Sequence, residues 1–444
     1  MDMGRAPRKL TSSQIIVLGF LGAILLGAFL LMLPISTADG KGATFADAIF
    51  TATSATCVTG LIVQDTATYW SVFGQAIILL MIQVGGMGVV TFAVAITVAS
   101  GKKIGLMQRS TMQEAISAPK MGGIVQLTGF ILKTTAIIEL TGAIAMMPAF
   151  IKEFGVGKGI WYSFFHSISA FCNAGFDLMG AKEKYSSLTY FIGNPLVNVV
   201  IMLLIIIGGI GFLVWEDIKT NRHHLRKYRM QSKLVLITSA VLILLPAICF
   251  FFTSFSGEPM LKRVFGSLFQ SVTTRTAGFN TADLTKMGSG NTALMIVLML
   301  IGGSPGSTAG GMKTTTLAVL ILTAVSVFRR KEHTNFAGRS IADSVMRNAI
   351  AIVTMYVSLF LAGGVAITVI EKLPMMTCMF ETASAIGTVG LTLGITPGLS
   401  IFSRIILIFL MYIGRVGGLT LIFSALTTNQ SNMARLPQEK ITVG

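Results

Sequence analysis

Eight apolar stretches, each long enough to cross a membrane, limit most strongly what this chain can fold into. They lie near residues 15–33, 71–98, 124–150, 195–215, 234–255, 291–327, 344–370 and 400–426. A bilayer core about 30 Å thick needs about 20 apolar residues of helix. Charged residues make up only 12% of the 444 residues, against about 25% in soluble domains. We therefore expect an all-α integral membrane protein with eight transmembrane helices.

Lysine and arginine clusters indicate which loops face the cytoplasm. The formal net charge is +16. Basic clusters mark the N-terminus, the segments near 99–123, 217–233 and 328–347, and the C-terminal tail. Cytoplasmic loops of membrane proteins are enriched in such residues. The pattern predicts a multi-pass protein of the cytoplasmic membrane with both termini in the cytoplasm, and the charge requires no nucleic-acid partner.

Four shorter apolar segments lie between these stretches and are followed by similar sequences. They lie near 45–56, 160–171, 262–273 and 375–386, and their length suits re-entrant helices better than spans. Each leads into a glycine string, in which a glycine precedes a large apolar residue. The strings are Thr56-Cys57-Val58-Thr59-Gly60-Leu61, Phe171-Cys172-Asn173-Ala174-Gly175-Phe176, Thr274-Arg275-Thr276-Ala277-Gly278-Phe279 and Ile386-Gly387-Thr388-Val389-Gly390-Leu391.

The match between the four copies extends beyond the strings. Ten positions before the glycines stand Phe50, Phe165, Leu268 and Phe380, and six before them stand Ser54, Ser169, Val272 and Ser384. Each following span contains a glycine pair: Gly85-Gly86, Gly208-Gly209, Gly302-Gly303 and Gly417-Gly418. An internal repeat of this kind predicts four units of span, short helix, glycine string and span. Their expected bounds are 1–100, 101–217, 218–328 and 329–444.

Non-helical backbone at membrane depth indicates a polar pathway. Such backbone is tolerated only where protein or a water-filled cavity satisfies its polar groups. Four strings around one axis would present rings of carbonyl oxygens that could replace the hydration shell of a cation. The short helices would aim their partially negative C-terminal ends at the same axis. The alternative for any single glycine is helix packing, where small residues let backbones approach.

Three aspartates follow the first three strings. Asp65, Asp177 and Asp283 would make the outer mouth of such a pathway electronegative and concentrate cations there. The alternative is that they are ordinary solvated charges in loops.

With these strings the chain resembles the Trk/Ktr/HKT superfamily of potassium transporters and is most similar to its bacterial Ktr membrane subunits. The resemblance implies a pseudo-fourfold pore within one polypeptide. It also implies a selectivity filter in which Gly60, Gly175, Gly278 and Gly390 carry the selectivity and potassium binds at the carbonyls of the strings. Glycine rather than serine at residue 60 implies a preference for potassium, while sodium could permeate or stimulate.

The last span of the third unit is interrupted by a run that no continuous helix should accommodate. It reads Gly302-Gly303-Ser304-Pro305-Gly306-Ser307-Thr308-Ala309-Gly310-Gly311. We expect a flexible intramembrane loop at about 302–313. The resemblance implies that this loop is a gate beneath the filter and that Arg415 lies beside it. A positive charge there would raise the barrier to cations, whereas the alternative is a structural, ion-paired arginine.

Other charges at membrane depth are less informative. Glu139 and Lys133 are six residues apart, on different helix faces, so we expect each to have a partner elsewhere. Arg275 could brace the back of the filter or play a plain structural role. Lys313 could extend to the cytoplasmic face.

These features favour potassium uptake through a gated, channel-like pore, without catalysis or a cofactor in this chain. A cation-coupled secondary carrier also uses broken helices, but four same-sense units fit a central pore better. An intramembrane serine hydrolase is a distant alternative, because Gly302-Gly303-Ser304-Pro305-Gly306 matches a nucleophile pattern without its strand-turn-helix context. The resemblance implies a homodimer in the lipid bilayer, regulated by a separate cytoplasmic nucleotide-binding ring.

Overall fold

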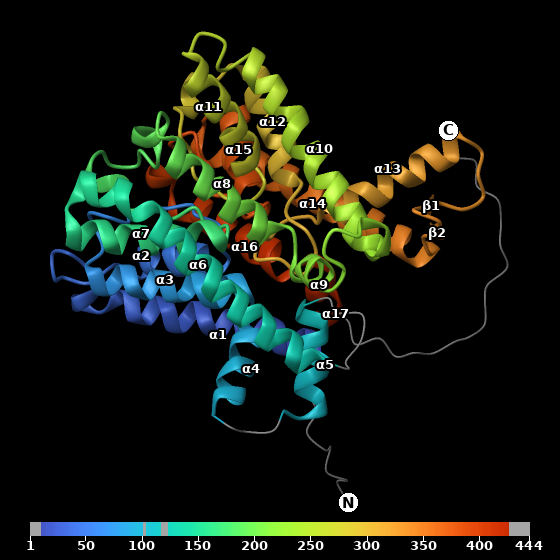
Figure 1. Cartoon of the computed structure of the whole chain (residues 1–444). Coiled ribbons are helices and arrows are strands. Elements are labelled where there is room, and N and C mark those ends of the chain that lie inside the picture. The colour runs from blue at the N-terminus through green and yellow to red at the C-terminus, as the bar shows by residue number, and fades with distance from the viewer. Residues whose placement is uncertain (1–9, 101–103, 117–122, 426–444) are drawn as a thin grey trace, which may run out of the picture.

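The computed structural model describes residues 10–100, 104–116 and 123–425, and these form helices almost throughout (Figure 1). The helices fall into four successive sets. The first contains α1 (Ser12–Met32), α2 (Phe45–Thr56), α3 (Val72–Met87) and α4 (Val89–Ala99), and the second α6 (Ile124–Phe154), α7 (Val156–Phe171), α8 (Pro195–Gly209) and α9 (Phe212–Asn221). The third contains α10 (Met230–Phe252), α11 (Met260–Thr273), α12 (Ser289–Leu300) and α13 (Thr314–Phe328), and the fourth α14 (Asp343–Glu371), α15 (Met375–Ile386), α16 (Ile401–Val416) and α17 (Gly418–Ala425).

The remaining elements are short and lie between or within these sets. Helix α5 (Leu106–Ile116) lies between the first and second sets. A hairpin of β1 (Asn335–Phe336) and β2 (Arg339–Ser340) lies between α13 and α14, with Asn335 opposite Ser340. Single-turn 3-10 helices span Pro34–Ser36, Met179–Ala181, Thr189–Phe191, Leu225–Lys227, Leu284–Lys286 and Thr396–Gly398.

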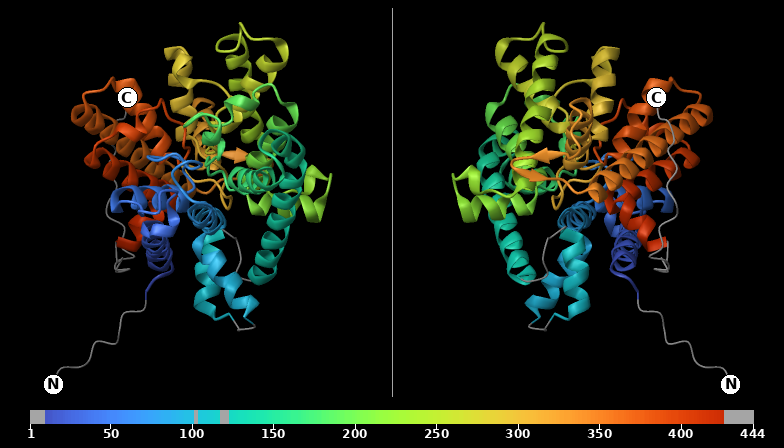
Figure 2. Two further views of the ribbon diagram at one scale, coloured as in Figure 1. Left: turned by 90° about the vertical axis from the view of Figure 1, so that its left-hand side faces the viewer. Right: turned by 90° about the vertical axis from the view of Figure 1, so that its right-hand side faces the viewer.

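The four sets surround a common centre. In Figure 2, the blue first set, the green second set, the yellow third set and the red fourth set follow one another around the molecule. The short helices α2, α7, α11 and α15 each bury at least one phenylalanine with 0% exposure: Phe50 in α2, Phe165 and Phe171 in α7, Phe269 in α11 and Phe380 in α15. The all-α membrane architecture with a pseudo-fourfold centre is therefore confirmed.

The expected spans are more broken than the sequence indicated. Four helices, α1, α6, α10 and α14, are individually long and apolar enough to cross a membrane. The pairs α3–α4 and α8–α9 meet that criterion only together and are bent by 96° and 95°. The stretches 291–327 and 400–426 are likewise divided, between α12 and α13 and between α16 and α17. The break expected in the third unit is therefore present, and the second spans of the other three units are also broken, which the sequence had not indicated.

Glycines in a left-handed conformation explain three of the breaks. Gly88, Gly211 and Gly417 have φ values of +88°, +96° and +90°, and each precedes the first residue of the next helix. A residue with a side chain rarely adopts such angles. The backbone therefore leaves the helix at these glycines even though the sequence stays apolar on both sides.

Candidate functional site

The four string glycines form a closed ring at the centre of the fold. A Cβ atom placed on any of them would collide with the carbonyl oxygen that precedes the glycine of a neighbouring unit. The distances are 2.5 Å from Gly60 to Ala174 O, 2.8 Å from Gly175 to Ala277 O, 2.2 Å from Gly278 to Val389 O, and 2.2 Å from Gly390 to Thr59 O. Because the fourth contact returns to the first unit, the strings encircle one axis, and their backbones are too close for any side chain at these positions.

The backbone of the strings is strained in the same way in every unit. The four glycines have φ between +70° and +94°. Two residues before them, side-chain-bearing residues are also left-handed: Val58 (+51°), Asn173 (+57°), Thr276 (+74°) and Thr388 (+49°). Such conformations cost about 1–3 kcal/mol each and cluster at ligand-binding sites. Their recurrence in four units indicates a backbone held for function.

Hydroxyl groups of the short helices hold the strings in place. Ser54 Oγ and Ser384 Oγ accept hydrogen bonds from the N–H groups of Gly60 (3.1 Å) and Gly390 (3.0 Å). Ser169 Oγ instead donates to Phe176 O at 2.7 Å. In the third unit the corresponding donor is Thr273 Oγ1, which bonds to Phe279 O at 2.5 Å. Thr273 therefore takes the place that the sequence alignment assigned to Val272.

The third unit is one residue shorter between helix and glycine. The N–H of Ala277 bonds to Thr273 O, four residues back, whereas that of Thr59 bonds to Ser54 O, five back. The same offset makes Phe269, rather than Leu268, the buried phenylalanine of this unit. The aligned columns were therefore wrong by one residue in the third unit.

Carbonyl groups at the ends of three short helices lie directly against glycines of the following spans. A Cβ on Gly85 would lie 2.0 Å from Thr56 O, one on Gly208 2.0 Å from Phe171 O, and one on Gly414 2.2 Å from Ile386 O. In the fourth unit, the glycine equivalent to Gly85 and Gly208 is thus Gly414. Gly417 instead marks the break between α16 and α17. Arg415 consequently stands where the first two units have Gly86 and Gly209.

Several buried hydroxyl and amide oxygens belong to the four strings. Within the described part of the chain, these buried side-chain atoms have no hydrogen-bond partner: Thr56 Oγ1, Thr59 Oγ1, Asn173 Oδ1, Thr276 Oγ1 and Thr388 Oγ1. Buried oxygens of this kind normally have a partner. Their recurrence in all four strings fits a polar centre.

A cavity of about 700 Å³, named here the outer cavity, opens at the ring of string glycines. All four string glycines line it, together with Asp177 and Asp283. Asp65 lies elsewhere: it is 5% exposed, and its carboxylate accepts hydrogen bonds from the N–H groups of Thr68 (2.9 Å) and Tyr185 (3.1 Å). The charge of Asp65 therefore stabilises a junction between the first two units, whereas the other two aspartates face the cavity.

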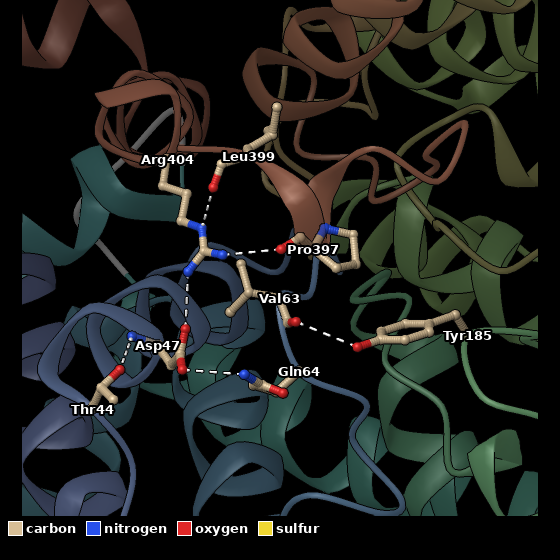
Figure 3. Close-up of polar contacts among 8 residues, drawn as sticks. All are labelled: Thr44, Asp47, Val63, Gln64, Tyr185, Pro397, Leu399 and Arg404. Carbon is tan, nitrogen blue, oxygen red and sulfur yellow. Dashed lines mark hydrogen bonds and ion pairs between the residues drawn. The ribbon is translucent and has the colours of Figure 1, made fainter. Parts of the chain in front are cut away.

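An ion pair that the sequence did not reveal joins the first and fourth units nearby (Figure 3). Arg404 Nη1 lies 3.0 Å from Asp47 Oδ1, and the same guanidinium donates to Leu399 O (2.9 Å) and Pro397 O (3.0 Å). Gln64 donates to the second oxygen of Asp47 at 3.2 Å. The one sequence signal for this contact is Asp47 itself, an acidic residue in the first turn of α2.

The intramembrane loop, residues 302–313, lies against the opposite side of the ring. A Cβ on Gly310 would lie 2.2 Å from Thr388 Oγ1, and one on Gly311 2.8 Å from Gly387 O. Thr308 Oγ1 donates to Phe171 O at 2.9 Å and accepts from Asn173 Nδ2 at 2.9 Å. The loop therefore contacts two strings at once. Ser304 Oγ hydrogen-bonds to Thr314 Oγ1 at 3.0 Å.

Two cationic side chains hold this loop. Arg415 donates to Thr308 O and to the carbonyl oxygens of Gly85 and Gly86, the last at 2.9 Å. Lys313 Nζ donates to Ala309 O at 2.9 Å. Both side chains also line an inner cavity of about 310 Å³. The loop and two cationic side chains thus lie between this side of the ring and the inner cavity.

Three further charges that the sequence singled out line neither of these two cavities. Arg275 is 8% exposed and donates to Ser239 Oγ on α10 at 3.2 Å, which fits the brace that the sequence left open. Glu139 accepts from Gln83 Nε2 at 3.2 Å, while Lys133 is exposed. As expected, Glu139 and Lys133 do not pair with each other.

The outer cavity predicts a pH-dependent cation affinity. Burial raises the pKa of the Asp177 carboxyl to about 7, although the N–H of Met179 opposes the rise. As pH increases through this value the carboxyl becomes charged, so uptake at low cation concentration should increase. One unit charge several ångströms from an ion in water is worth about 0.5 kcal/mol, roughly a twofold change in affinity.

Asp283 provides the control for this prediction. A hydrogen bond from Thr285 lowers the pKa of Asp283, so this carboxyl stays ionised at neutral pH. Asp177→Asn should abolish the rise in apparent affinity near pH 7, whereas Asp283→Asn should lower the affinity on both sides of pH 7 and leave the rise in place. A rise that persists in Asp177→Asn would contradict the assignment.

Comparison with known proteins identifies similar chains. Residues 7–435 match the TrkH family, described as cation transport protein. The potassium/sodium uptake protein NtpJ of Enterococcus hirae is 39% identical, over 99% of both chains. The Ktr system potassium uptake protein B of Bacillus subtilis is 40% identical, over 98% of this chain and 97% of its own. The crystal structure of the potassium transporter TrkH from Vibrio parahaemolyticus has a similar fold, with a TM-score of 0.75 at 19% identity, covering 96% of this chain and 87% of that one.

Proposed function

This chain belongs to the TrkH family of cation transport proteins, and on that premise we propose that it takes up potassium through a gated, channel-like pore. The carbonyl-lined ring is the selectivity filter. The observation that carries the proposal is the cyclic contact of four glycines with four neighbouring carbonyls. The potassium uptake named for two relatives of about 40% identity supports it.

The filter works by exchanging water for backbone oxygen. A potassium ion that enters from the outer cavity loses its hydration shell, and rings of carbonyl oxygens replace it. The C-terminal ends of α2, α7 and α15 add partial negative charge to the same place. The membrane potential drives entry with about 2.3 kcal/mol per charge per 100 mV. Sodium also permeates or stimulates, as the name of the Enterococcus relative suggests.

The intramembrane loop acts as the gate. Its contacts with Asn173 and Thr388 on one side and with Arg415 on the other support a closed pathway in this conformation. Opening requires the loop to leave the axis, which breaks the hydrogen bonds of Thr308 and Arg415. The ion then passes into the inner cavity.

Regulation comes from other chains. The Ktr system relatives support a membrane protein that works with a separate subunit. We further propose a homodimer on a cytoplasmic nucleotide-binding ring, with both termini on the cytoplasmic side.

Rubidium flux into proteoliposomes under an imposed voltage tests the proposal. We expect uptake that follows the direction and size of the voltage and needs no counter-transported ion. Potassium should compete with rubidium more strongly than sodium does. Liposomes without protein serve as the control. Uptake that requires a second ion on the opposite side and ignores the voltage would indicate a carrier instead.

A further inference from the structure

The intramembrane loop is held by the second unit as well as by its own. The break between α8 and α9 makes these backbone hydrogen bonds to it: Ser304 N to Gly209 O (3.0 Å), Thr308 N to Gly208 O (3.2 Å) and Phe212 N to Gly306 O (2.6 Å). Because Phe212 is the first residue of α9, any movement of α9 pulls on the middle of the loop.

The break itself has no room to absorb such a movement. A Cβ on Gly211 would lie 2.6 Å from Pro305 O, so the loop packs directly on the backbone of the break. Trp215 Nε1 donates to Ile207 O at 3.0 Å, which fixes α9 to the end of α8. The side chain of Trp215 is 6% exposed. The orientation of α9 is therefore coupled to the position of the loop.

A buried carboxylate fixes the other side of α9. Asp217 is 3% exposed. Its Oδ2 accepts hydrogen bonds from Arg229 N (3.0 Å) and Ser232 Oγ (2.6 Å), and its Oδ1 lies 3.5 Å from Arg229 Nε. Arg229 and Ser232 belong to the start of α10, in the third unit. Asp217 thus ties α9 to the unit that carries the intramembrane loop.

The neighbouring residue offers a matched comparison. Glu216 pairs with the same arginine, with 2.7 Å between Oε2 and Nη2. Its side chain is 35% exposed, however, and that of Arg229 is 43% exposed. Exposed ion pairs contribute little, typically about 0–1 kcal/mol, whereas removing a buried acceptor leaves its donors unsatisfied. The two acids therefore differ in burial while sharing a partner.

We propose that Asp217 is a positioning residue that keeps the gate closed by holding α9. The inference rests on the proposed function, because it assumes that the intramembrane loop is a gate. Without the carboxylate, the N–H of Arg229 and the hydroxyl of Ser232 lose their acceptor and α9 is free to turn. The hydrogen bond from Phe212 to Gly306 then moves with it, and the loop is drawn from the axis.

Rubidium flux through the purified protein alone, without a cytoplasmic partner, tests this role. Asp217→Ala should raise flux about tenfold, corresponding to about 1.4 kcal/mol. Asp217→Asn and Ser232→Ala should raise it less, because each retains an acceptor for the N–H of Arg229. Glu216→Gln, the control, should leave flux unchanged.

The same variants in a protein lacking residues 304–311 separate the possible causes. If Asp217 acts through the gate, Asp217→Ala should add nothing once the loop is absent. An equal change in both backgrounds, or a lower melting temperature without a change in flux, would overturn the inference. A deletion that leaves flux unchanged would instead overturn the gate, and the inference with it. If Asp217→Ala does not fold, unchanged flux in both Asp217→Asn and Ser232→Ala also overturns it.

Discussion

Replacing Gly278 by serine is expected to reduce potassium flux about tenfold or more, which corresponds to a barrier to permeation that is higher by about 1.4 kcal/mol or more. The new Cβ would lie 2.2 Å from Val389 O and 3.2 Å from the Cα of Gly175. Both contacts are backbone atoms of other filter strings, so relief requires the ring itself to deform. Carbonyl oxygens that have moved no longer match the ion, and potassium loses its advantage over sodium.

Gly394 separates this contact from simple backbone strain. It has φ of +90°, like Gly278 at +81°, but nothing lies within 4 Å of its Cβ position. Forcing a side chain into a left-handed conformation costs about 1–2 kcal/mol at either site. Gly394→Ser should therefore lower stability slightly and leave rubidium flux and potassium-over-sodium competition unchanged. Equal losses of flux in the two variants would attribute the effect to strain, and normal selectivity in Gly278→Ser would contradict the filter assignment.

The ring of glycines could be predicted from the sequence because the residues that it requires recur in each of the four units. Each unit needs a glycine where another unit's carbonyl approaches, with a buried phenylalanine nine or ten residues and a hydroxyl group five or six residues before it. The third unit escaped the alignment because the turn after α11 closes one residue earlier, as the bond from Ala277 N to Thr273 O shows. A column counted back from Gly278 cannot detect this difference in turn length.

Hydropathy could not predict where the spans are broken. Apolar residues continue on both sides of Gly88 and Gly211, so a window of composition shows one span. The broken backbone is satisfied by partners far away in sequence: Phe212 N bonds to Gly306 O, and Arg415 bonds to Gly85 O and Gly86 O. Such long-range contacts decide where a helix ends, and a local pattern does not contain them.

The roles of the charged residues could not be predicted from the local sequence either. Asp65 and Asp177 both follow a string and both looked suited to the outer mouth. The loop around Tyr185 buries Asp65 between units, while Asp177 faces the cavity. Asp47 seemed unremarkable until α16 brought Arg404 within 3.0 Å. The residue types predicted a charged outer mouth. Tertiary contacts, however, decide which of these acidic residues stabilises the fold and which one faces the pathway.

Arg415→Ala is expected to raise potassium flux about tenfold or more, through a change of at least about 1.4 kcal/mol. Two effects act in the same direction. At about 5 Å and an effective dielectric constant of about 20, one positive charge repels a passing cation by about 3 kcal/mol. The guanidinium also joins Thr308 O of the intramembrane loop to Gly85 O and Gly86 O of the first unit. Its loss both lowers the barrier and releases the loop.

Arg415→Lys separates the two effects. Lysine keeps the charge, but a single ammonium group lacks the planar fork that reaches carbonyls of two units at once. Flux close to wild type in Arg415→Lys would assign the barrier to charge, and flux close to that of Arg415→Ala would assign it to the clamp.

The deletion of residues 304–311 and a second arginine complete the comparison. Gly302 N already bonds to Met312 O at 2.7 Å, so the ends of the loop lie close together and the shortened chain can close there. The deletion should raise flux at least as much as Arg415→Ala does. Arg404→Ala, on the same helix but at the outer ion pair with Asp47, should lower thermal stability without raising flux. Slower transport by well-folded Arg415→Ala and by the deletion would mean that the loop supports the pathway rather than closing it.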